Sequence, residues 1–109
     1  MKRKQLCIVL VTVRSRKEGR AIAGMLLKRK LAACVNLLPL VESHFWWNGK
    51  IDRASECLLV IKSIRSHFRQ LAATVRLHHS YQVPEIIALP LAAAERAYAS
   101  WWKKSLQPK

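Results

Sequence analysis

Acidic residues, glycines and catalytic motifs are all scarce in this chain of 109 residues. Six Asp and Glu residues stand against twenty Lys and Arg, and no close pair of carboxylates suggests acid–base catalysis. The three glycines, Gly19, Gly24 and Gly49, form no phosphate-binding loop, and no serine lies in a G-x-S-x-G motif. These absences argue against an enzyme, and we expect a protein that works by binding.

Cysteine is also scarce, and long apolar runs are missing. Cys7, Cys34 and Cys57 are an odd number at wide spacing, which fits neither a disulfide framework nor a C-x-x-C metal site. We therefore expect buried, reduced thiols and a cytoplasmic protein. No apolar run reaches about 18 residues without a charge or a proline, so we expect no transmembrane helix and no membrane partner.

The N-terminal residues MKRKQ and LCIVLVTV superficially resemble a signal peptide. No small-residue cleavage site follows, however, because the next residues are the basic RSRKEGR. The apolar side chains of residues 5–13 would lie on both faces of an extended chain. We expect this segment to form a strand that is covered on both sides.

Positive charge is what the chain has in excess. The formal net charge is +14, and ten of the twenty basic residues fall in the first thirty positions. Such a charge favours a nucleic acid or another polyanion as partner. A helix with a solvated basic face would look the same, and the aromatic residues of an RNA-recognition sheet are missing from LCIVLVTV and LLVIK. A nucleic-acid-binding or polyanion-binding module is therefore the alternative hypothesis.

A long β-hairpin between residues 31 and 63 is the most informative feature. Its two β-prone arms are joined by Asn48-Gly49, which favours a type I′ turn because both central residues of that turn have positive φ. Pro39 predicts a bend or break in the first arm, since proline cannot donate to the ladder. Both arms carry apolar residues for both faces, which is more apolar surface than one small domain covers.

Helical and extended periodicities alternate in a regular order along the chain. Ser15 and Glu18 form a capping-box pattern, which marks the start of the first helix. The predicted elements are a strand over 5–13, a helix over 16–30, strands over 31–47 and 50–63, a helix from 66, a strand over 85–91 and a helix over 93–105. The order β-α-β-β-α-β with a terminal helix predicts one α+β, ferredoxin-like domain over residues 1–109.

The predicted sheet has a face that its own helices do not cover. In a ferredoxin-like domain both main helices pack on one face of the antiparallel sheet. Here the strands are apolar on the other face too, and the terminal helix is too short to cover the whole hairpin. An exposed apolar face of this size is a liability, so we expect another copy of the chain to cover it.

Six segments carry a resemblance to a known family. They are LVTV (10–13), KLAACVN (30–36), SHFWWNGKI (43–51), SECLLVIKS (55–63), HHSYQVPEIIALPL (78–91) and YASW (98–101). In this order and spacing they resemble the CutA family of divalent-ion tolerance proteins, from about Ile8 to Trp102. The resemblance implies a ferredoxin-like homotrimer that is related in architecture to small signalling regulators and linked to tolerance of copper and other divalent metals.

The resemblance also implies copper ligands, namely a Cys late in the first strand and a His-His pair. His78 and His79 match the pair, whereas Val11 stands where the family has the Cys. Neighbouring helical residues point about 100° apart, so the two histidines share one ion only if the helix ends there. The alternative is that one caps the helix end and the other forms a hydrogen bond in the loop. Cys34 is a candidate thiol ligand, with inert burial as its alternative.

A polar cluster lies where an apolar strand begins. Glu85 is poorly placed for a core, and Tyr81 stands four residues before it. In a trimer this loop would lie near a neighbour's hairpin, which suggests an inter-subunit pocket for a small ligand or an anion. The expected pocket residues are Trp46, Trp47, Lys50, Tyr81, Pro84 and Glu85. The alternative is a plain interface, in which Glu85 pairs with a Lys or Arg and the tryptophans pack between chains.

Overall fold

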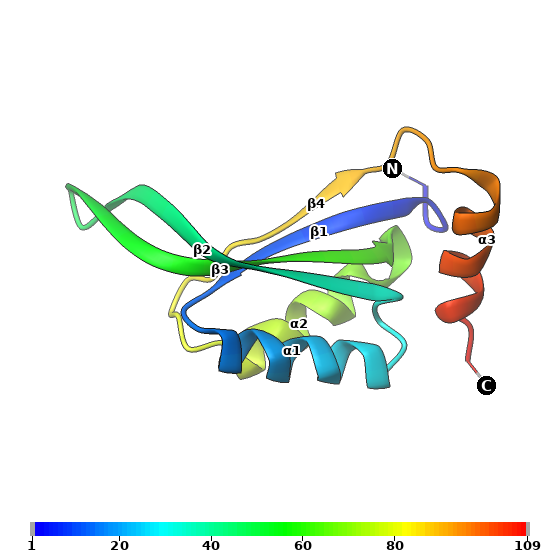
Figure 1. Ribbon diagram of the computed structural model, residues 1–109, viewed down its shortest axis with the longest axis horizontal. Coiled ribbons are helices and arrows are strands. Elements are labelled where there is room, and N and C mark those ends of the chain that lie inside the picture. Colours follow the sequence, from blue (N-terminus) through cyan, green and yellow to red (C-terminus); the bar gives the residue numbers. More distant parts are fainter. Residues whose placement is uncertain (1, 109) are drawn as a thin grey trace.

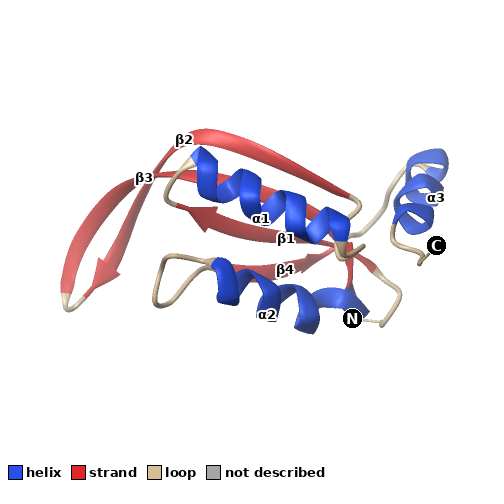
Figure 2. Ribbon diagram, turned by 90° about the horizontal axis from the view of Figure 1, so that it is seen from below, coloured by secondary structure: helices blue, strands red, loops and turns tan. Residues whose placement is uncertain are grey.

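A four-stranded antiparallel sheet with two helices on one face forms the body of the protein (Figure 1, Figure 2). The computed structural model describes residues 2–108, and the strand order is β2-β3-β1-β4. The elements are β1 (Leu6–Val13), α1 (Arg16–Lys28), β2 (Cys34–Trp47), β3 (Lys50–Ile64), a 3₁₀ turn (Arg65–His67), α2 (Phe68–His78), β4 (Ile86–Pro90) and α3 (Arg96–Ser105). This order confirms the predicted ferredoxin-like fold with a terminal helix.

The main core lies between the sheet and helices α1 and α2. Every second residue of β1 from Cys7 to Val13 is buried on the helix side, as strand alternation requires. A Cβ atom on Gly19 would lie 2.9 Å from Leu37 Cδ1, so the glycine lets α1 approach the sheet closely. The buried cluster comprises Cys7, Val9, Val11, Val13, Ile22, Leu26, Leu31, Ala32, Cys57, Leu59, Ile61, Leu71 and Val75.

The hairpin of β2 and β3 has the turn and the irregularity that the sequence predicts. Asn48 and Gly49 have φ values of 51° and 76°, as a type I′ turn requires. The pairing register shifts between Leu38 and Val41, so the residues at positions 39 and 40 form a bulge in β2. Leu40 in this bulge has a φ of 61°, which is unusual for a leucine. The proline therefore distorts the long arm without ending it.

The face of the sheet opposite α1 and α2 is apolar, as predicted. Leu10 lies on it between its cross-strand partners Val60 and Ile87, and its strand neighbours Val9 and Val11 point to the core. We call this surface the open face; its apolar residues are Ile8, Leu10, Leu38, Leu58, Val60, Ile87 and Leu89. Leu38, Ile87 and Leu89 are 44–48% exposed, so the single chain leaves much of this face in water.

Helix α3 covers only one end of the sheet (Figure 1). Trp102 of α3 and Leu106, which follows the helix, are buried against Leu6, and the Trp102 Nε1–H donates a hydrogen bond of 3.0 Å to the Ser63 carbonyl. The rest of the open face continues away from α3 toward the hairpin. The terminal helix thus leaves most of the apolar surface uncovered.

Element boundaries differ from prediction by a few residues. Helix α1 ends at Lys28 rather than residue 30, because Lys30 has a φ of 60° and cannot continue a right-handed helix. Helix α3 begins at Arg96 rather than 93, because the Glu95 carboxylate accepts the Tyr98 backbone N–H and acts as the N-cap. The predicted Ser15 cap is confirmed by a 3.2 Å hydrogen bond from the Glu18 backbone N–H.

The structure also describes the state of the cysteines and the lengths of the helices. The three cysteines are free, Cys7 and Cys57 are buried, and Cys34 is partly buried. Among residues 2–108, no helix combines the length and the apolar composition that crossing a membrane requires.

Candidate functional site

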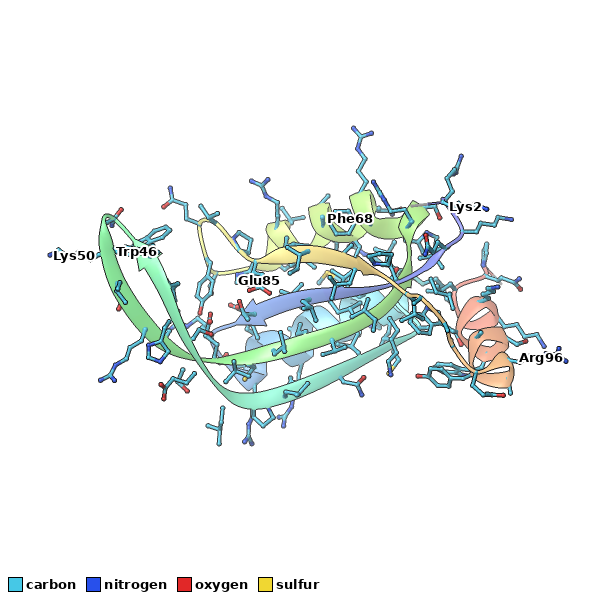
Figure 3. The ribbon with its side chains drawn as sticks, turned by 90° about the horizontal axis from the view of Figure 1, so that it is seen from above. Lys2, Trp46, Lys50, Phe68, Glu85 and Arg96 are labelled. Carbon is cyan, nitrogen blue, oxygen red and sulfur yellow. The ribbon has the colours of Figure 1, made fainter. Side chains whose placement is uncertain are left out.

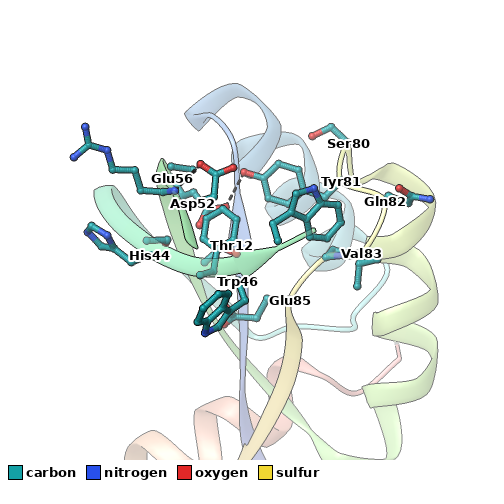
Figure 4. Close-up of a pocket in the computed structure, with 16 residues that line it drawn as sticks. Thr12, His44, Trp46, Asp52, Glu56, Ser80, Tyr81, Gln82, Val83 and Glu85 are labelled. Atoms are coloured by element: carbon teal, nitrogen blue, oxygen red, sulfur yellow. Dashed lines mark hydrogen bonds between the residues drawn. The ribbon is translucent and has the colours of Figure 1, made fainter. Parts of the chain in front are cut away.

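A cleft of about 950 Å³ lies between the outer half of the hairpin and the loop that precedes β4. Five of the six predicted pocket residues line it, and all five belong to the same chain (Figure 4). The lining residues include Thr12, Trp46, Trp47, Asp52, Glu56, Tyr81, Pro84 and Glu85. The sixth, Lys50, lies at the outer tip of the hairpin, away from Glu85 (Figure 3). The sequence predicted that these residues meet across a subunit boundary, whereas the structure brings five of them together within one chain.

A tyrosine–carboxylate pair forms the inner wall of the cleft. The Tyr81 hydroxyl donates a hydrogen bond of 2.7 Å to Glu56 Oε2 (Figure 4). Glu56 is only 7% exposed, although its side chain carries a carboxyl group. Burial raises the pKa of Tyr81 far above its usual value, and the bond to the Glu56 carboxylate raises it further. The phenol therefore stays protonated at neutral pH and remains a hydrogen-bond donor.

His79 connects the loop before β4 to strand β1 through two hydrogen bonds. Its side chain is fully buried, and its Nε2–H donates to the Thr12 carbonyl at 2.7 Å. Its Nδ1 accepts the Tyr81 backbone N–H at 3.0 Å. A carbonyl can only accept and a backbone N–H can only donate, so these partners define a neutral ring with the proton on Nε2. Glu18 Oε1 lies 3.8 Å from Nδ1, beyond hydrogen-bond distance.

His78 points to a different partner from His79. Its Nδ1–H donates to the Thr74 carbonyl of its own helix at 2.9 Å, which caps the end of α2. The two rings therefore match the alternative interpretation of the pair, with one histidine capping the helix and the other bonded in the loop. Among residues 2–108 no group of three His, Cys, Asp or Glu side chains is arranged to hold a metal ion.

Cys34 lies outside this cleft, where β2 begins. Its Sγ is 3.8 Å from the Lys62 ammonium and 3.8 Å from the Asn36 side chain. Lys62 in turn donates to the Tyr98 hydroxyl at 3.0 Å, and this bond raises the pKa of the lysine. The thiol thus lies beside a cation near α3, at the opposite end of the hairpin from Trp46.

Sequence reasoning missed Glu56, the most buried carboxylate of the cleft. On β3 the odd-numbered residues from Cys57 to Ser63 point to the core, so Glu56 shares the open face with Leu58 and Val60. An acid beside the apolar side chains of Leu58 and Val60 is the same kind of signal that drew attention to Glu85. It could have identified Glu56 as well.

Glu85 provides a test of the electrostatics of the cleft. Partial loss of hydration on the cleft wall raises the pKa of its carboxyl, and the neighbouring Glu56 carboxylate raises it further. Between the ordinary pKa of a glutamic acid and this raised value, the folded chain holds a proton that the unfolded chain has lost. The free energy of unfolding therefore falls as the pH rises through that window.

Glu85→Gln should remove this contribution. We expect the variant to gain stability relative to wild type as the pH rises from about 4 to about 7. Urea unfolding of both proteins at a series of pH values measures the difference. A difference in unfolding free energy that does not change with pH would show that the cleft does not raise the pKa of the Glu85 carboxyl.

In sequence, the chain is similar to divalent-ion tolerance proteins. Residues 7–105 match the family described as CutA1 divalent ion tolerance protein. The divalent-cation tolerance protein CutA of Thermus thermophilus is 40% identical over 98 residues, which are 90% of this chain and 95% of that protein. The chloroplastic protein CutA 1 of Oryza sativa is 43% identical over 90% of this chain, which spans 55% of that protein's length.

The fold agrees with a solved structure as well. The crystal structure of CutA1 from Oryza sativa superposes with a TM-score of 0.92 at 40% identity, covering 97% of each chain. The agreement extends over nearly all of the sheet and helices, so the likeness is one of the whole fold and not of a shared motif.

Proposed function

The chain belongs to the CutA1 divalent ion tolerance family, and on that premise we propose that it acts as a homotrimer that binds ligands without chemical turnover. The observation that carries this proposal is the open face, an apolar surface beside a preformed cleft. Water contact with such a surface is unfavourable, and a second and third copy of the chain are the natural cover. Burial of apolar area then provides the free energy of assembly.

Assembly would place the cleft at a subunit boundary. Glu56 and Thr12 line the cleft, and they share the open face with Leu58 and Leu10. Copies that cover this face would therefore border the cleft, where the tip of a neighbour's hairpin could complete it. This arrangement supports a role in which ligand binding is coupled to the packing of subunits, as expected of a small signalling trimer.

The absence of turnover is also part of the proposal. Tyr81 stays protonated because burial and Glu56 raise its pKa, so its oxygen is a poor nucleophile and a poor base at neutral pH. His79 uses both ring nitrogens in hydrogen bonds to the backbone. These groups are arranged to hold the loop and to donate hydrogen bonds, which suits binding better than proton transfer.

Divalent metal binding, with copper as the expected metal, is proposed at the end of α2. His79 has no free nitrogen, whereas no hydrogen bond within residues 2–108 engages Nε2 of the exposed His78. Imidazole suits Cu²⁺, which heads the affinity order of divalent metals. A single imidazole makes a weak site, so a strong one needs ligands from another chain.

Calorimetric titration with Cu²⁺ tests this assignment. We expect saturable binding to wild type, no measurable binding to His78→Ala, and unchanged binding to His67→Ala, a matched histidine in the 3₁₀ turn. Identical isotherms for wild type and His78→Ala would remove His78 from the site.

A cytoplasmic location is proposed as well. The three cysteines are free, and two of them are buried in the core. Reduced thiols without a disulfide framework are typical of a reducing compartment.

A second candidate function, polyanion binding, is favoured by one observation on α1 and α2. The exposed basic residues of the two helices are Arg16, Lys17, Arg20, Lys28, Arg69 and Arg76. The single acid on these helices is Glu18, whose side chain is 14% exposed and turned toward His79. The helix layer would stay exposed when the open face is covered, and its charge attracts phosphate backbones.

Titration of a fluorescent oligonucleotide over a salt series tests this candidate. We expect binding that weakens steeply as salt rises, because each neutralised phosphate releases counterions. The absence of binding at about 50 mM salt would reject it.

A further inference from the structure

The cleft carries negative charge on a protein that is otherwise strongly positive. Asp52, Glu56 and Glu85 line it, and they are three of only six acids in a chain of net charge +14. Arg53 is the one Lys or Arg among the lining residues that the structure describes. Counting only Lys and Arg against Asp and Glu, the formal charge of the lining is 1 − 3 = −2. The cleft is thus suited to a cation, whereas the sequence suggested a small ligand or an anion.

Glu56 is a buried carboxylate without a cationic partner. It is 93% buried, faces the cleft and accepts a hydrogen bond from the neutral Tyr81 hydroxyl. The close ionisable pairs within residues 2–108 join His44 to Glu42 and His79 to Glu18, so neither includes Glu56 or Glu85. Buried charges in proteins are usually paired, and twenty basic side chains were available to supply a partner. A carboxylate this buried, with no Lys or Arg at ion-pair distance within residues 2–108, favours a positive group that comes from outside the chain.

The walls of the cleft indicate what kind of cation fits. Phe45, Trp46, Trp47 and Tyr81 line it, and Trp46 is 72% exposed in the single chain. Aromatic faces attract alkylammonium groups through cation–π contact and cover their carbon chains. A bare metal ion needs converging ligands, and residues 2–108 offer no group of three carboxylate, imidazole or thiol side chains for one. The carboxylates lie around an opening of about 950 Å³, which suits an extended ligand.

We propose that the cleft binds a small organic ammonium cation, whose charged group pairs with Glu56 and Glu85 while its carbon chain lies against Trp46 and Trp47. The proposal deepens the proposed function, since it rests on the cleft as the ligand site and names the ligand class. Figure 4 shows Trp46, Tyr81, Glu56 and Glu85 around the same opening. A positive ligand would also relieve the repulsion between the two glutamates, which adds to burial in raising the pKa of Glu85 in the free protein.

Titration with 1,4-diaminobutane tests the proposal, with 1,4-butanediol as the neutral control of equal length and MgCl₂ as the divalent control. We expect saturable calorimetric binding of one diamine per chain and a change in tryptophan fluorescence, with no binding of the diol. Binding of the diol as tight as that of the diamine would overturn the proposal. Mg²⁺ that competes with the diamine at equal ionic strength would overturn it too.

Variants locate the site. Glu56→Gln and Glu85→Gln should each weaken diamine binding about tenfold or more, since each removes a charge-assisted bond. Glu95→Gln, the same change at an exposed helix cap away from the cleft, should bind as wild type does. Far-UV circular dichroism checks folding, and Glu85→Gln keeps the test valid if the Glu56 variant does not fold. Equal affinity in Glu85→Gln and wild type would overturn the assignment.

The neighbouring subunit is the other source of an ammonium group. If Lys50 of another copy filled the cleft, the diamine would bind Lys50→Ala and not wild type, and that result would overturn the proposal of a free ligand. Light scattering on the same samples distinguishes a failure of this ligand inference from a failure of the proposed trimer. A trimer that binds no diamine rejects this inference alone, whereas a monomer rejects the proposed assembly.

Discussion

Leu10→Asp should convert the proposed trimer into monomers. Leu10 lies at the centre of the open face, opposite Val60 and Ile87, and the single chain covers it only in part. Assembly would bury three unpaired carboxylates, one in each copy, at several kcal/mol each. The isolated fold tolerates the change better, because the residue is not part of the main core. Light scattering should give a mass near 12.5 kDa for the variant.

Leu77→Asp is the matched control for this experiment. Leu77 is 78% exposed on α2, on the side of the molecule opposite the open face. The same substitution there should leave the wild-type mass unchanged. An unchanged mass for Leu10→Asp would show that the open face is not the assembly surface, and a monomeric Leu77→Asp would assign assembly to the helix layer instead.

Trp102→Ala should cost about 3–5 kcal/mol of folding free energy. The indole is 2% exposed, packs against Leu6 and Leu106, and donates its Nε1–H to the Ser63 carbonyl at 3.0 Å. Truncation leaves a cavity under α3 and a buried carbonyl without this donor. Urea unfolding at one fixed protein concentration measures the loss, because the stability of an oligomer depends on concentration.

Trp101 supplies the comparison within the same helix. It is 45% exposed and stacks on Tyr98 with a centroid distance of 5.3 Å. Trp101→Ala should cost less than about 1.5 kcal/mol, the scale of an exposed aromatic pair. If both tryptophan variants lost the same stability, the account of α3 as a helix anchored by one buried indole would be wrong.

The fold was predictable because its signals are local. Alternation in β1, the Ser15 cap and the Asn48-Gly49 turn each depend on residues within one element. These features together allow few topologies, and the resemblance to the CutA family pointed to the same one. The apolar open face followed from the same alternation, because both parities of β1 are apolar.

Details that depend on several distant segments were harder to predict. The resemblance to the CutA family implied His78 and His79 as a pair of copper ligands, and the folded chain sends one ring to Thr74 and the other to Thr12, which is the alternative interpretation of the pair. The Thr12 carbonyl lies 67 positions away, and nothing in the local pattern indicates that bond. Predicting it would require the packing of the loop on β1.

The cleft includes residues that local sequence patterns identified and one, Glu56, that was not identified from the sequence. Tyr81 and Glu85 were found because a polar pair at the start of an apolar strand is locally unusual. Glu56 was missed because its strand reads as a buried run, and its partner Tyr81 is 25 positions away. Its 7% exposure and its lack of a cationic partner emerge only from the assembled site.

The molar mass of the wild-type protein in solution tests the central claim most directly. Covering the open face with two further copies predicts 3 × 12.5 = 37.5 kDa by light scattering at micromolar concentration. A mass of 12.5 kDa, with Leu38, Ile87 and Leu89 left in contact with water, would contradict the account.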